Sequence, residues 1–110
     1  MSKSPLDLID HILVEVSFLK QTRQGLTQEI FSQDALRQRA FTRSLEIIGE
    51  AVKNFTKQYP HIEWKAIAGM RDKLIHHYFG VDYSLVWDIV ENKIDTLQID
   101  LEQIKATLEH

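Results

Sequence analysis

The chain has 110 residues and a mass of 12.9 kDa, with 44% hydrophobic and 26% charged residues, which is typical of one globular domain. It has no cysteine, which excludes disulfide bonds, thiolate metal sites and cysteine nucleophiles. No apolar run approaches the roughly 18 residues needed to cross a membrane, and residues 1–5 lack the apolar stretch of a signal peptide. We therefore expect a single cytoplasmic domain over residues 1–110.

The formal net charge of −3 is unevenly distributed. Residues 37–77 carry a net +4, whereas residues 1–36 carry −2 and residues 78–110 carry −5. A negative total argues against a polyanionic partner, but it says nothing about where the charges lie. The basic middle segment permits a nucleic-acid surface without requiring one, because solvated helix faces give the same pattern.

Four glycines and two prolines predict a chain of mostly long helices. The first helix should begin at Ser4 and Pro5, which supply an N-cap oxygen and a preset φ, and should end near Gly25. Its predicted apolar stripe advances in steps of three and four residues: Leu6, Ile9, Leu13 and Val16.

A second helix is predicted from near Ser32 to Tyr59, where Pro60 ends it. Its predicted buried face consists of Leu36, Ala40, Ile47, Ala51 and Phe55. A short helical turn is expected over residues 63–68, with Trp64 and Ile67 facing inward.

The last helix should begin after Asp82 or Ser84. Its apolar seam steps regularly by three and four: Trp87, Val90, Ile94, Leu97, Leu101, Ile104 and Leu108. This pattern is typical of bundles and predicts an antiparallel bundle of four to five helices. Residues 108–110 resemble the start of a histidine tag, so His110 is left out of the chemistry although Leu108 fits the seam.

The histidines and acids show no metal-binding spacing, and there is no glycine-rich phosphate loop. We therefore expect no metal and no cofactor. The unusual cluster is Arg71, His76, His77 and Tyr78, with Lys73 beside it, between Gly69 and Gly80.

These residue types suit metal-free cleavage of RNA. Histidine transfers protons near neutral pH, and the arginine fork matches two phosphate oxygens. On one straight helix, however, His76 would lie about 140° around from Arg71, so either the helix is distorted or a second chain completes the site. From the residues alone a structural interpretation stays open, in which Arg71 pairs with a carboxylate such as Glu50 and His76 caps a helix.

The spacing Arg-x4-His-x-Tyr, here Arg71, His76 and Tyr78, resembles the motif of HEPN domains of the HepT-like toxin family. The resemblance extends over nearly the whole chain, through residues 46–53, 59–64, 67–72, 78–82 and 86–90. Two departures are Glu63 before Trp64, where family members often have proline, and the absence of proline in residues 92–97.

The resemblance implies a dimerising helical bundle that acts as a metal-independent endoribonuclease toxin on transfer or messenger RNA, through a composite dimer cleft. Arg71 and His76 would be catalytic, with Asp72 and Tyr78 supporting them and Lys73 and His77 as weaker RNA contacts. The implied antitoxin is a minimal nucleotidyltransferase that adds AMP to Tyr78. Two alternatives stay open: a non-catalytic adaptor that binds this nucleotidyltransferase, and a purely structural homodimer.

Overall fold

A computed structural model of the chain describes residues 4–60 and 82–109. Its elements, in chain order, are α1 (Pro5–Thr22), α2 (Gln28–Phe31), α3 (Ala35–Gln58), α5 (Tyr83–Asp88), the π-helical turn η1 (Ile89–Lys93) and α6 (Ile94–Leu108). These two ranges contain no strand, so the predicted all-α class is confirmed. None of the helices described is long and apolar enough to span a bilayer.

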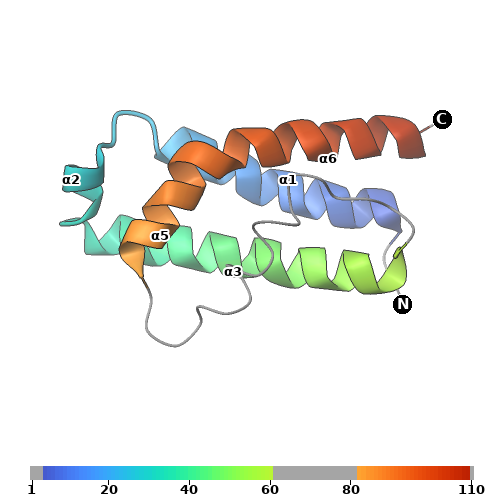
Figure 1. The fold of residues 1–110 in the computed structure, drawn as a ribbon, viewed down its shortest axis with the longest axis horizontal. Helices are drawn as coiled ribbons and strands as arrows, with labels where there is room; N and C mark the ends of the chain where they lie inside the picture. The colour runs from blue at the N-terminus through green and yellow to red at the C-terminus, as the bar shows by residue number, and fades with distance from the viewer. Residues whose placement is uncertain (1–3, 61–81, 110) are drawn as a thin grey trace.

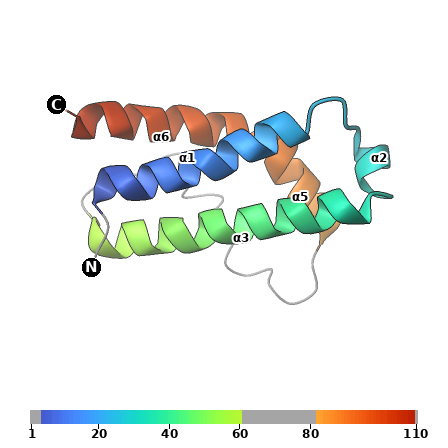
Figure 2. The ribbon, with the colours of Figure 1, turned by 180° about the vertical axis from the view of Figure 1, so that it is seen from behind.

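The long helices form a bundle in which α1 packs against both α3 and α6. Figure 1 shows that α1 runs antiparallel to these two helices, and that both chain ends lie at the same end of the bundle. Seen from behind, α5 crosses from the start of α6 towards the first half of α3 (Figure 2). The predicted antiparallel bundle is therefore confirmed, whereas the helical turn expected over residues 63–68 lies outside the described residues.

The helix ends follow the local sequence. The amide of Asp7 donates to Ser4 Oγ at 3.2 Å, so Ser4 is the N-cap of α1 as predicted. After α1 the chain turns at Gly25, whose φ of +77° is accessible mainly to glycine. The second long helix begins at Ala35, behind the N-cap Asp34, and not near Ser32, which instead follows the short helix α2. It ends before Pro60, as predicted.

The buried face of α1 is broader than the predicted stripe. Its core residues are Leu8, Ile9, Ile12, Val16 and Leu19. Leu6 and Leu13 are only half-buried and lie at the edges of this face. The reason is that α1 packs against two helices at once, which requires a wider apolar surface than one seam.

The predicted inner face of α3 is wrong at its start. Leu36 is 78% exposed, and Ala40 and Ile47 are only half-buried. The face is instead centred on Phe41, Leu45, Ile48 and Val52, together with the correctly predicted Ala51 and Phe55. The short helix α2 explains the difference, because it places Phe31 on Phe41, with ring centroids 5.2 Å apart.

The predicted seam of the last helix is confirmed. Its residues are buried from Trp87 to Ile104, and Leu108 packs against the core at the edge. The helix begins behind the N-cap Asp82, as expected. It is not continuous, however, because the π-helical turn η1 divides it into α5 and α6.

Candidate functional site

The candidate catalytic segment lies in the part of the chain that the structure does not describe. This applies to each predicted site residue: Arg71, Asp72, Lys73, His76, His77 and Tyr78. Their roles stay predictions, and so does the pairing of Arg71 with Glu50, which is exposed on α3. The structure instead describes the helices on either side of this segment, which are α3 before it and α5 after it.

The end of α3 and the start of α5 are far apart. α3 ends at Gln58 and is capped by Tyr59, whereas the chain resumes at Asp82, the N-cap of α5. Figure 1 shows that α5 starts beside the first half of α3, so the two attachment points lie near opposite ends of that helix. With 24 residues, α3 is about 36 Å long at 1.5 Å per residue. The segment with the motif therefore joins points that are separated by most of the bundle's length.

An aromatic cluster fixes the start of α5, where the described part of the chain resumes. The ring of Phe31 lies 5.4 Å from that of Trp87 and 6.5 Å from that of Tyr83, centroid to centroid. Phe31 is 1% exposed and Trp87 is 8% exposed, which confirms Trp87 as a core residue. Asp82 Oδ1 also accepts the amides of Ser84 and Leu85, at 3.0 and 3.3 Å. The start of α5 is thus fixed by both packing and capping.

One charged stripe follows the solvent side of α3, with side chains recurring every three or four residues: Arg39, Arg43, Glu46, Glu50, Lys53 and Lys57. Arg43 pairs with Glu46 at 3.4 Å. Within residues 4–60 and 82–109, no carboxylate lies within ion-pair distance of Arg39, Lys53 or Lys57. These three cations are therefore available to an anionic partner, as far as the described part of the chain shows.

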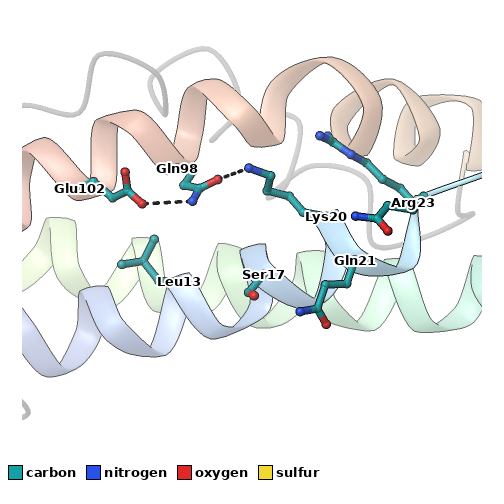
Figure 3. A pocket seen from close by; sticks show the side chains of 8 residues that line it. Leu13, Ser17, Lys20, Gln21, Arg23, Gln98 and Glu102 are labelled. Atoms are coloured by element: carbon teal, nitrogen blue, oxygen red, sulfur yellow. Dashed lines mark hydrogen bonds between the residues drawn. The ribbon is translucent and has the colours of Figure 1, made fainter.

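A groove of about 430 Å³ lies between α1 and α6 (Figure 3). Lys20 donates to Gln98, and Gln98 donates to Glu102 at 3.0 Å, so a polar chain crosses the groove. Lys20 also lies 3.4 Å from Asp95. Because its cations already have acidic or amide partners, the groove is poorly suited to bind phosphate.

Arg23 is a residue that the sequence analysis missed. It extends from the end of α1 to Val90 and Asp95, which are 67 and 72 residues away in the sequence. No local sequence pattern predicts a hydrogen bond between residues so far apart in the sequence. Among the residues described, no group of three or more histidine and carboxylate side chains is arranged to hold a metal ion.

The family model described as "Ribonuclease HepT-like" matches residues 12–104. The chain is 46% identical over 106 residues to a "Putative RNase" of Caldanaerobacter subterraneus subsp. tengcongensis, covering 93% of this chain and 95% of the relative. It is 38% identical over 109 residues to "Probable ribonuclease HepT" of Thermococcus cleftensis, covering 96% and 99%. No solved structure gives a significant match. The extent of these matches shows that the chain belongs to the HepT-like ribonuclease family.

Proposed function

We propose that the chain is a metal-independent endoribonuclease in which Arg71 and His76 carry the reaction. The observation that carries the proposal is the Arg-x4-His-x-Tyr motif in a chain that matches the HepT-like family over residues 12–104. The relatives' names as RNases support the same substrate class.

The proposed chemistry is attack of a ribose 2′-oxygen on the adjacent phosphorus. The 2′-hydroxyl loses its proton, the bond from phosphorus to the 5′-oxygen breaks, and the products are a 2′,3′-cyclic phosphate and a 5′-hydroxyl. His76 serves the proton transfers, because imidazole changes protonation near neutral pH. Arg71 stabilises the charge on the phosphate through its fixed pair of donors. Asp72 and Tyr78 orient these groups.

The stripe on α3 offers a path for the RNA backbone. Arg39 and Lys57 are 18 residues apart, which corresponds to about 27 Å along the helix. Together with Lys53 they provide cations that no described carboxylate neutralises. Lys73 and His77 add contacts near the motif. Binding through phosphates in this way weakens steeply as salt rises.

The regulation we propose has two parts. Two copies of the chain pair their motifs into one composite cleft, which brings Arg71 of one copy near His76 of the other even if a straight helix would separate these residues within one copy. A minimal nucleotidyltransferase antitoxin transfers AMP to the Tyr78 hydroxyl. The added phosphate then repels RNA from a site built to attract it.

The test is cleavage of a mixed RNA substrate by the purified protein in EDTA. Wild-type protein should produce cyclic-phosphate ends, and Arg71→Ala and His76→Ala should each lose at least about 100-fold of the rate, as is typical for acid–base catalysts. The matched control is His11→Ala, because His11 is an exposed histidine on α1 outside the motif. Cleavage that requires a divalent metal would refute the mechanism.

The adaptor hypothesis predicts the opposite result. An adaptor would show no cleavage by the unmodified protein, but it would form a stable complex with the nucleotidyltransferase. Mass spectrometry after incubation with this enzyme and ATP tests the modification, which should add one or more AMP groups to the wild-type chain and none to Tyr78→Phe.

A further inference from the structure

The π-helical turn η1 interrupts the hydrogen-bond ladder of the last helix. The amide of Ile94 donates to the carbonyl of Ile89, five residues earlier. In an α-helix the same amide would serve Val90, four residues earlier. The carbonyl of Val90 therefore loses its α-helical donor inside the protein, where an unmade hydrogen bond is costly.

Arg23 supplies the missing donor. Its Nη1 donates to the Val90 carbonyl at 2.8 Å. Its Nη2 donates to both carboxylate oxygens of Asp95, at 2.8 and 2.9 Å. The Arg23 side chain is only 18% exposed, so it is packed at the turn. One guanidinium thus joins the end of α1 to both sides of the junction between η1 and α6.

The turn sets the direction of α5. Figures 1 and 2 both show α5 inclined steeply to α6, instead of continuing along its axis. This inclination brings Trp87 and Tyr83 onto Phe31 and places the start of α5 beside the first half of α3. A change in the bend would therefore move Asp82, which follows Tyr78 by only four residues in the sequence.

We propose that Arg23 is a positioning residue of the ribonuclease, which holds the π turn between α5 and α6 and thereby fixes where the motif segment rejoins the bundle. This inference rests on the proposed function for its catalytic consequence, whereas its structural part stands on the contacts of Arg23. Arginine is required because its fixed fork of donors reaches a carbonyl and a carboxylate at once. Lysine offers only a single point charge.

The structural part is tested by a double-mutant cycle that combines Arg23→Met with deletion of Asn92, an exposed residue of η1. Removing one residue turns the π turn into ordinary α-helix and gives Val90 its helical donor again. Arg23→Met should lower the Tm of the wild-type chain by about 4–8 °C. In the deletion background the loss should be less than half as large, and an equal loss in both backgrounds would overturn the proposal.

Hydrogen exchange provides a second measurement in case the deletion variant does not fold. In Arg23→Met, the amides of residues 90–95 should exchange at least tenfold faster than in wild type, and those of residues 101–106 should be unchanged. Uniform acceleration would contradict a local role. The matched control is Lys105→Met, which breaks a 2.8 Å ion pair with Asp10 between the same two helices, away from the π turn.

The catalytic part is tested by steady-state cleavage well below the Tm of the variant. Arg23→Met should lower kcat about tenfold with KM within twofold of wild type, whereas Lys105→Met should change neither. Full kcat in Arg23→Met would overturn the positioning role while leaving the proposed function intact. If wild-type protein does not cleave RNA, the proposed function fails, and the cycle and the exchange data still decide whether Arg23 holds the turn.

Discussion

Phe31 is the side chain on which the junction of α2, α3 and α5 depends, and its truncation is our strongest stability prediction. It is 1% exposed and is the buried residue of the four-residue helix α2. Its ring contacts three others, those of Phe41, Trp87 and Tyr83. Phe31→Ala removes these contacts and leaves a cavity between three helices.

Truncation of a buried phenylalanine costs about 3–5 kcal/mol, and the ring pairs of Phe31 argue against the lower end of this range. We expect about 4 kcal/mol, which at roughly 4 °C per kcal/mol lowers the Tm by about 16 °C. The assay is urea unfolding followed by circular dichroism at 222 nm. The control is Ile30→Ala, because its neighbour Ile30 is 50% exposed and should cost less than about 1 kcal/mol. Equal losses in the two variants would refute the described packing of α2.

Four further predictions concern a helix end, an exposed side chain and the pH dependence of two ion pairs. Ser4→Ala should lower the free energy of unfolding, measured by thermal unfolding, by about 1 kcal/mol, because the amide of Asp7 loses its hydrogen-bond acceptor. Leu36→Ala should change this free energy by less than about 0.5 kcal/mol, since Leu36 is 78% exposed. Hydrogen bonds from Arg23 lower the pKa of Asp95. The contribution of the Asp95 carboxylate to the free energy of unfolding is therefore present above the unfolded-state pKa of 3.8, and it is lost as the pH falls through the lower folded-state value. Asp95→Asn should flatten the fall in Tm below about pH 4. A hydrogen bond to Asp10 raises the pKa of Lys105. The contribution of the charged Lys105 to the free energy of unfolding is therefore lost as the pH rises through the folded-state value above 10.5, and Lys105→Met should flatten the fall in Tm in that pH range.

Helix ends were predictable because their causes are local. Ser4 caps the start of α1, and Pro60 follows the end of α3, which it cannot continue. Gly25 adopts the positive φ that the turn after α1 requires. The seam of the last helix was predictable for a similar reason, since a regular spacing on one helix specifies one face. These signals need no knowledge of which element packs against which.

The errors arose where packing partners decide the outcome. Leu36 fits an apolar spacing but is exposed, whereas Phe31 of α2 is buried and packs on Phe41 at the start of α3. A four-residue helix such as α2 is too short to show periodicity. The π turn and its partner Arg23 were equally hidden, since 67 residues separate Arg23 from Val90. The motif itself was readable from residue types and spacing, whereas its geometry belongs to residues outside the described ranges.

The fold also resolves the conflict between a net charge of −3 and an RNA substrate. Residues 78–110 carry a net −5, and α6 presents several of these acids, whereas α3 presents the stripe with Arg39, Lys53 and Lys57. Because α1 packs between these helices, as Figure 1 shows, the acidic helix α6 is separated from the helix that carries the charged stripe. Electrostatic fields in salt solution decay over roughly 10 Å, so RNA that approaches α3 responds mainly to its cations. A chain that is acidic in total can therefore present a locally attractive surface to RNA.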